Sequence, residues 1–434
     1  MASNVLSEYM RTSSPHPVAR KRPGTTVIKF EHTRTSGSRS GMRAAEQHPG
    51  PATARTFAEE YPAEPVAEPS TDGIVQGCIK QLTAVDLQSP TMCVDIDSDG
   101  LTAAYGCFNG TVKLHKINKR PEKHNMTSLV DQNPSPISDV RHIKLPQQAK
   151  ESSPSPLLAT AHSNGSVAIW DTRDNIVLTR YQDAAKAVFS LAFSQQCRKM
   201  ATASQDCQVR IYDMESGSRK CSVLGDVFDE DPGVVAPRTD VCMYGSHSSH
   251  VYAVKFNPND DNLLISGGWD RGVRLWDLRT KSHVKTLGAC GPIVTGDSLD
   301  YKKAGDVILV GSHSRDNCLE EYDVGTGKVI STIKLSVPSQ ICCCQYMGGD
   351  QNVVLCGGKQ DNMMRVLSTT GDGGTLARVS NLERSVYSVA HCKPRDHKVT
   401  VKRKGGELVT RTERFGFIAM CTDTLVCIYR HEIE

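Results

Sequence analysis

The sequence predicts an all-β fold, a single β-propeller of seven four-stranded antiparallel blades. From about Ile74 onward, short apolar segments alternate with turns rich in Gly, Asn, Asp and Ser, which is typical of an all-β chain. A template of strand, tight turn and strand recurs seven times along this region. An apolar segment ahead of the first blade is placed to close the ring.

The clearest copy of the template runs from Leu263 to Asp277. It reads as a strand, a tight turn at Asp270 and a second strand that ends in Trp276-Asp277. The segment Val251–Phe256 precedes it as a further strand, and Leu278–Leu287 follows it as the fourth. Four strands joined by turns make one propeller blade.

The seven copies share a turn residue, which is Asp or Asn, and a bulky residue six positions later. Asp and Asn suit a tight turn because their side chains bond the local backbone and tolerate a left-handed conformation. The residue after the bulky one is Asp in four of the seven copies. The turn residues are Asn109, Asn164, Asp206, Asp270, Asp316, Asp361 and Asp423.

Over roughly residues 74–434 the chain resembles the WD-repeat (WD40) family, whose blades end in Trp-Asp and begin near Gly-His. The family's repeat period is about 40–45 residues, and three intervals between the turn residues are longer, so they carry insertions. The resemblance is weak in the first, sixth and seventh blades. It is specific in the blades that end at Asp171, Asp213, Asp277 and Asp323.

The resemblance implies a structural network in the fourth blade. There Asp270 accepts a hydrogen bond from His247, and Ser266 bridges to Trp276. A metal pair with His250 is the alternative role for His247. The other blades lack the histidine, so they are expected to rely more on packing.

Closure of the ring predicts a role for the segment Ile79–Leu87. After the sixth blade, the sequence offers only three strands for the last blade, at Val386–His391, Phe415–Met420 and Leu425–Tyr429. An unclosed propeller leaves an open sheet edge. We therefore expect Ile79–Leu87 to pair as the outer strand of the last blade.

Residues 1–72 are expected to form a disordered tail ahead of a propeller domain at 73–434. The tail is basic and then acidic, and it shows no apolar period, so it cannot bury enough surface to offset its ordering entropy. The alternative is a linear motif that folds onto a partner, with Val27–Phe30 as the candidate docking segment. The run Ala19–Arg22 resembles a short nuclear signal.

Composition favours a soluble intracellular protein, in the cytoplasm with the nucleus as the alternative. The net charge is +3 and the hydrophobic fraction is 38%, and apolar runs fall short of the roughly 18–20 residues of a membrane span. Met1–Arg11 lacks the apolar stretch of a signal peptide. The 16 cysteines contain no CxxC pair, so we expect buried thiols rather than metal or redox sites.

Candidate partner-binding residues lie on the face that carries the tight turns. The residue before each turn is predicted to face that opening, and Trp269 is the first candidate because Trp is enriched in binding hot spots and has little to pack against in its own blade. The alternative is that Trp269 packs on a neighbouring loop. The other candidates at this position are Arg315, Phe108, Gln205 and Gln360, and the inner-strand residues Phe189, Tyr252 and Tyr387 share a second position on the same rim.

Three insertions offer further surfaces, each with a plain solvated loop as the alternative. Pro146–Pro156 contains two Ser-Pro sites that phosphorylation would charge, and Gly225–Ser246 is acidic. Arg395–Arg414 is expected to form a basic hairpin that contacts phosphate or an acidic partner. Its basic residues include Lys398, Lys402, Arg403, Lys404 and Arg411.

The sequence contains no catalytic constellation that we can identify, and no cofactor, metal or small-molecule substrate is expected. Gly325–Lys328 lacks the spacing of a phosphate-binding loop, and no zinc-ligand spacing occurs. We therefore expect a non-catalytic scaffold that binds other proteins. The alternatives are a nucleic-acid-associated propeller that uses the basic tail and hairpin, and an enzyme that uses carboxylates in the channel.

Overall fold

The computed structural model describes residues 74–117, 126–144, 157–182, 186–216, 221–224, 246–280, 282–287, 291–314, 316–359, 362–370, 374–402 and 408–433. The predicted tail lies outside these residues, as do the Ser-Pro sites and all of the acidic insertion except Ser246.

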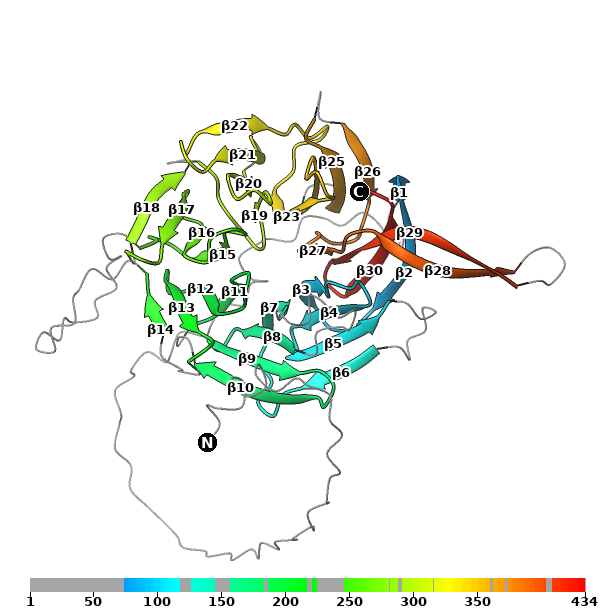
Figure 1. Cartoon of the computed structure of the whole chain (residues 1–434), viewed down its shortest axis with the longest axis horizontal. Helices are drawn as coiled ribbons and strands as arrows, with labels where there is room; N and C mark the ends of the chain where they lie inside the picture. The colour runs from blue at the N-terminus through cyan, green and yellow to red at the C-terminus, as the bar shows by residue number, and fades with distance from the viewer. Residues whose placement is uncertain are drawn as a thin grey trace, which may run out of the picture. The chain divides into compact units, whose positions relative to one another are not determined.

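The described chain forms seven antiparallel sheets that surround a centre, each with its first strand innermost (Figure 1). The prediction of a seven-bladed all-β propeller is therefore confirmed. Blades 1 to 3 are β3 (Thr91–Ile96), β4 (Thr102–Cys107), β5 (Thr111–Lys116) and β6 (Met126–Val130); β7 (Ile137–His142), β8 (Leu157–His162), β9 (Ser166–Asp171) and β10 (Ile176–Gln182); and β11 (Val188–Phe193), β12 (Lys199–Ser204), β13 (Val209–Asp213) and β14 (Cys221–Val223).

Blades 4 to 6 follow the same order from the inner to the outer strand. They are β15 (Val251–Phe256), β16 (Leu263–Gly268), β17 (Val273–Asp277) and β18 (Ser282–Leu287); β19 (Leu299–Tyr301), β20 (Val307–Gly311), β21 (Leu319–Asp323) and β22 (Val329–Thr332); and β23 (Ile341–Met347), β24 (Val353–Gly358), β25 (Met363–Ser368) and β26 (Thr375–Ser380).

Blade 7 is completed by a strand from the start of the described chain. It contains β27 (Ser388–His391), β29 (Leu408–Cys421) and β30 (Leu425–His431), and β2 (Ile79–Asp86) pairs with β30 as its outer strand. The predicted closure is therefore confirmed. The inner strand β27 also contacts β3 of blade 1, so the ring closes at its centre as well as at its rim.

One strand was not predicted from the sequence. β1 (Ile74–Gly77) pairs with β26, so blade 6 has five strands. Gly77 allows the chain to pass from there to blade 7, because it has φ +91° and a Cβ on it would lie 2.2 Å from the Leu376 carbonyl oxygen.

The turns after the second strand of each blade follow the chemistry that the sequence predicts. Asn109 accepts a hydrogen bond from the Thr111 amide at 3.1 Å, and Asn164 accepts one from the Ser166 amide at 3.0 Å. The residue after the turn residue adopts a left-handed conformation in six blades. These residues are Gly110, Gly165, Cys207, Arg271, Asn317 and Asn362.

The bulky residue of the template fills the space between blades. In all seven blades its side chain is buried, at 0–3% exposure. Such large side chains at one repeated position form a core that each blade shares with its neighbour. The seven residues are His115, Trp170, Tyr212, Trp276, Tyr322, Leu367 and Tyr429.

The cysteines of the described residues are free thiols, and most are buried. Burial raises the pKa of Cys356 to about 12 and that of Cys392 to about 11, so both remain protonated and behave as small apolar side chains.

Candidate protein-binding surface

Four rings gather where blades 3 and 4 meet. Phe189 of β11 stacks on Tyr252 of β15, with ring centroids 4.6 Å apart and planes 15° apart. Trp269, which follows β16, lies 5.4 Å from the Tyr252 ring, and His250 lies 6.0 Å from the Trp269 ring. We call Phe189, His250, Tyr252 and Trp269 the aromatic group.

A β-bulge explains why the two inner-strand rings meet. The pairing of β11 with β12 shifts at Phe189, and the pairing of β15 with β16 shifts at Tyr252. A bulge inserts an unpaired residue and redirects its side chain. Because both bulges lie at the start of an inner strand, next to the end of the second strand, the two rings lie on the face that carries the tight turns.

Trp269 is half-buried and packs on two rings of its own blade, Tyr252 and His250. The expectation that it finds little to pack against in its own blade is therefore wrong, because the bulge brings Tyr252 to the rim. Its indole Nε1 is buried and has no hydrogen-bond acceptor. An unbonded buried N–H costs about 1–3 kcal/mol, so the position of the Trp269 ring depends on its packing on Tyr252 and His250.

The other predicted rim residues differ in exposure, and Gln205 lies beside the strand of Phe189, since its amide bonds the Ala187 carbonyl at 2.8 Å. Phe108 of blade 1 is 42% exposed, and Tyr387 of blade 7 and Gln205 of blade 3 are half-buried. Arg315 and Gln360 lie outside the described residues. Thr422, which precedes the turn of blade 7, is buried at 3% exposure, so this position does not present a side chain to solvent in every blade.

The predicted basic hairpin forms from Arg395, and its second strand is continuous with the second strand of blade 7. β28 (Arg395–Lys402) pairs with β29, which starts at Leu408 rather than Phe415, and the two strands project from blade 7 in Figure 1. The strands carry Lys398 opposite Thr412, Lys402 opposite Leu408 and Arg411 opposite Val399. Arg403 and Lys404 lie outside the described residues.

Ring contacts anchor the base of the hairpin to the blade. His397 stacks on Phe415 at 4.1 Å, and the Arg430 guanidinium lies 4.0 Å from the Phe415 ring centroid on the β30 side. Arg430 also pairs with Glu413 at 2.8 Å. These contacts hold the hairpin strands as an extension of blade 7.

Charged side chains on and beside the inner strands pair with one another near the centre of the ring. Arg141 of blade 2 contacts Asp297, next to blade 5, at 2.8 Å and Asp139 at 3.2 Å, and Lys255 of blade 4 contacts Asp297 at 2.8 Å. Burial raises the pKa of Asp139 to about 6. Burial also opposes ionisation of Asp297, but Arg141 and Lys255 outweigh it and hold the pKa of Asp297 well below its usual range.

The four predicted network residues of blade 4 lie within hydrogen-bond distance of one another. His247 Nδ1 is 2.9 Å from the Asp270 carboxylate, and His247 Nε2 is 2.7 Å from Ser266 Oγ. Trp276 Nε1 donates to the same hydroxyl at 2.7 Å. A neutral imidazole that donates from Nδ1 and accepts at Nε2 satisfies this arrangement.

Blade 2 builds a similar network from a different histidine, which the sequence prediction missed. Trp170 Nε1 donates to Thr160 Oγ1 at 2.9 Å, and His162 Nε2 lies 2.9 Å from the same hydroxyl. His162 Nδ1 then reaches the Ser135 carbonyl at 3.2 Å. Blade 2 lacks a histidine at the position of His247, as predicted, but it does not rely on packing alone, because a histidine from the end of its second strand forms the network.

Within the described residues, no group of three or more His, Cys, Asp or Glu side chains is placed to hold a metal ion. The same residues contain no helix long and apolar enough to cross a membrane.

Comparison with known proteins finds the repeat family in two stretches. The family model described as WD domain, G-beta repeat matches residues 176–213 and 239–277. Each match ends at the Asp that closes the third strand of a blade, here Asp213 and Asp277.

Curated relatives are similar over part of the chain. Nuclear distribution protein nudF of Aspergillus niger is 26% identical over 38% of this chain and 42% of its own length. The U3 small nucleolar RNA-associated protein 15 homolog of Gallus gallus is 22% identical over 58% of this chain and 42% of its own length. The Ribosome biogenesis protein WDR12 homolog of Ixodes scapularis is 28% identical over 28% of this chain and 24% of its own length. The chain spans less than half the length of these relatives.

We predict that Ser266→Ala lowers the free energy of unfolding by about 2–4 kcal/mol, because two buried groups, His247 Nε2 and Trp276 Nε1, lose their shared partner. Chemical denaturation measures the change. Ser266→Thr keeps the hydroxyl, as Thr160 does in blade 2, and should retain most of the stability. The exposed Ser248→Ala should change it by less than about 0.5 kcal/mol. An equal loss for Ser266→Thr would contradict the role of the hydroxyl.

We predict that stability falls as the pH drops from 7 to 5. Burial lowers the pKa of His162 and of His247, so the unfolded chain, whose histidines titrate near pH ~6.5, takes up protons before the folded chain. Each such histidine removes up to about 1.4 kcal/mol per pH unit below that value. Asp139, with its raised pKa, works in the opposite direction, so the measurement is the difference between the wild type and His247→Gln. Identical pH profiles for the two proteins would disprove the assignment of His247 as a buried neutral group.

Proposed function

We propose that this seven-bladed β-propeller, which matches the WD-repeat model in the stretches that end at Asp213 and Asp277, is a non-catalytic scaffold whose protein partners dock at the aromatic group. The observation that carries the proposal is the pair of half-buried rings, Phe189 and Trp269, which pack on the buried Tyr252 ring at the face of the tight turns. Binding energy at protein interfaces concentrates in Trp, Tyr and Arg side chains near the centre of the contact. Trp269 supplies a half-buried ring, part of which is open to solvent.

The paired charges near the centre of the ring support a structural role rather than catalysis. Asp139 accepts hydrogen bonds from the Leu191 and Val140 amides at 2.8 Å, and Asp300 accepts one from the Tyr346 amide at 2.8 Å. Asp297 is held by Arg141 and Lys255. A general acid or base needs a carboxylate that is free to reach substrate, and these carboxylates are occupied by the protein itself.

We predict that Trp269→Ala reduces the recovery of at least one bound protein fivefold or more in affinity purification of the tagged chain, measured by quantitative mass spectrometry. The ring supplies apolar contact that alanine cannot replace. Circular dichroism should show a folded protein, because the half-buried ring contributes little to the core.

Leu82→Ala is the matched control for this experiment. Leu82 is 38% exposed on the outer strand of blade 7, away from the face of the tight turns, and its truncation should leave the set of bound proteins unchanged. If Trp269→Ala recovers the same proteins in the same amounts as the wild type, the proposed docking surface is wrong.

A second candidate function is association with RNA through the basic hairpin. Two observations favour it: the hairpin carries Lys398, Lys402 and Arg411 on paired strands, and two of the relatives are named for ribosome biogenesis and for a small nucleolar RNA. Positive charge along an extended ribbon binds phosphate without regard to sequence.

If the hairpin binds RNA, the triple variant Lys398→Glu, Lys402→Glu and Arg411→Glu should weaken binding of a single-stranded uridine oligomer at least tenfold. It should also make the dependence of affinity on salt less steep, because fewer counterions are released. The control reverses three exposed lysines on other strands and turns: Lys116, Lys328 and Lys334. Equal binding by the two triple variants would remove this candidate.

A further inference from the structure

The outer edge of blade 6 already receives an added strand. β1 pairs with β26 from Ile74 opposite Ser380 to Gly77 opposite Ala377, and the Arg378 Nε donates to Gln76 Oε1 at 2.7 Å. The added strand thus uses backbone pairing together with one polar contact from an arginine on the edge strand. Strand addition of this kind is a general way for a sheet to bind an extended peptide.

The outer strand of blade 2 repeats the features of β26. β10 has a bulge at Leu178, and β26 has one at Leu376. In each strand, regular pairing with the neighbouring strand of the blade resumes at the next residue. Arg180 lies two residues after the first bulge and Arg378 two residues after the second. β10 is the edge of its sheet, and no described strand pairs with its outer side.

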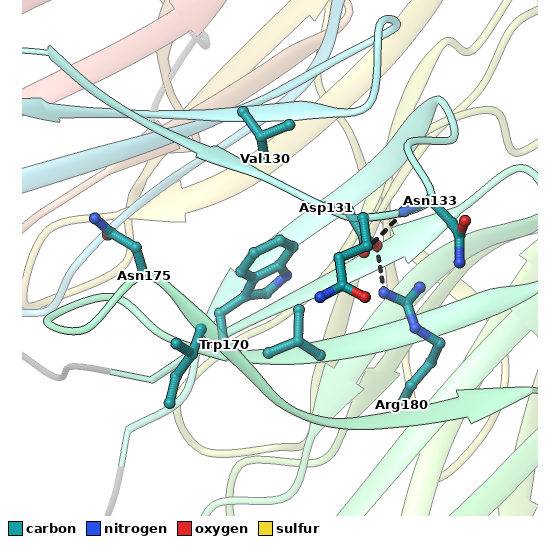
Figure 2. A pocket seen from close by; sticks show the side chains of 9 residues that line it. Val130, Asp131, Asn133, Trp170, Asn175 and Arg180 are labelled. Carbon is teal, nitrogen blue, oxygen red and sulfur yellow. Dashed lines mark hydrogen bonds and ion pairs between the residues drawn. The ribbon is translucent and has the colours of Figure 1, made fainter. Parts of the chain in front are cut away.

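A hollow of about 470 Å³ opens beside this edge, between blades 1 and 2. Its apolar lining includes Val130, Trp170, Ile176 and Val177. Val130 is 61% exposed and Ile176 is 48% exposed, so the rim of the hollow is apolar and open to solvent. Figure 2 shows the Trp170 ring between Asn175 and the pair formed by Asp131 and Arg180.

The polar end of the hollow presents hydrogen-bond donors. Arg180 pairs with Asp131, and its Nη1 donates to Ser166 Oγ at 3.3 Å. The Arg180 side chain is 32% exposed, whereas that of Asp131 is only 4% exposed. A guanidinium has five N–H donors, so an incoming chain meets unused donors of Arg180 while the carboxylate stays covered.

We propose that the outer edge of blade 2 at Thr179–Gln182 binds an extended peptide of a partner protein as a fifth strand. The peptide carries Gln or Glu opposite Arg180, as β1 carries Gln76 opposite Arg378. Side chains alternate along a strand, so the residue two positions later faces the same side, toward the hollow. A branched aliphatic side chain there packs on Val130, Trp170 and Ile176.

The test uses a fluorescent peptide that copies residues 71–82 of this chain with Gln76→Glu and Cys78→Ile. Fluorescence polarisation with the full-length protein should give saturable binding. Val130→Asp and Ile176→Asp should each weaken it at least tenfold, because a carboxylate in the apolar hollow repels the acidic peptide and is costly to desolvate. Both side chains are exposed, so neither variant should affect folding. Alanine in place of the glutamate in the peptide should also weaken binding.

Val284→Asp is the matched control, since Val284 is 56% exposed on the outer strand of blade 4, and it should bind the peptide like the wild type. Trp269→Ala should also bind normally, which separates this site from the aromatic group. Absence of saturable binding, or equal affinity for Val130→Asp and the wild type, overturns the proposal. Equal affinity for the two proteins would indicate that the peptide binds blade 6 in place of β1.

Discussion

The inner strands of a propeller leave one backbone edge without a partner strand, and in this protein the preceding blade supplies side chains to that edge. Asp95 of blade 1 accepts the His142 amide at 2.7 Å, and Asp139 of blade 2 accepts the Leu191 amide at 2.8 Å. Ser388 of blade 7 accepts the Val94 amide at 3.2 Å. Buried amides need acceptors, so each of these side chains fixes the register of one blade against the next. The contact from Ser388 does so at the place where the ring closes.

These acceptors explain why the centre of the ring is so rich in charge. The buried Asp139, which accepts two amides, contacts Arg141, and the neighbouring Asp297 contacts both Arg141 and Lys255. Because Arg141 reaches from blade 2 to Asp297 near blade 5, it also links blades that are not neighbours along the ring. These central charges are thus part of the framework of the ring.

The sequence predicts the parts of the fold that repeat. The tight turns, the buried bulky residue and the closing strand at Ile79 each follow from a local pattern that recurs or from the need to close a sheet. β1 was missed because it has four residues, ends in Gly77 and gains its partner only through a non-local contact with β26. The prediction missed His162 because this histidine lies at the end of a strand, whereas His247 lies in the loop before the inner strand of its blade. The sequence places Trp269 directly before the turn residue, but the packing of Trp269 on Tyr252 depends on a bulge that the residue types do not predict.

Bulges also recur on the outer strands, and they limit what those edges can bind. Five outer strands carry one extra aliphatic residue at the same register position, and an edge interrupted in this way cannot pair along its full length with another strand. The residues are Leu82, Leu178, Val284, Ile330 and Leu376. β1 obeys this limit, because it pairs with β26 only beyond the bulge at Leu376. A bulged edge therefore resists sheet-to-sheet aggregation while it still admits a short strand, as β26 admits β1 beside Arg378.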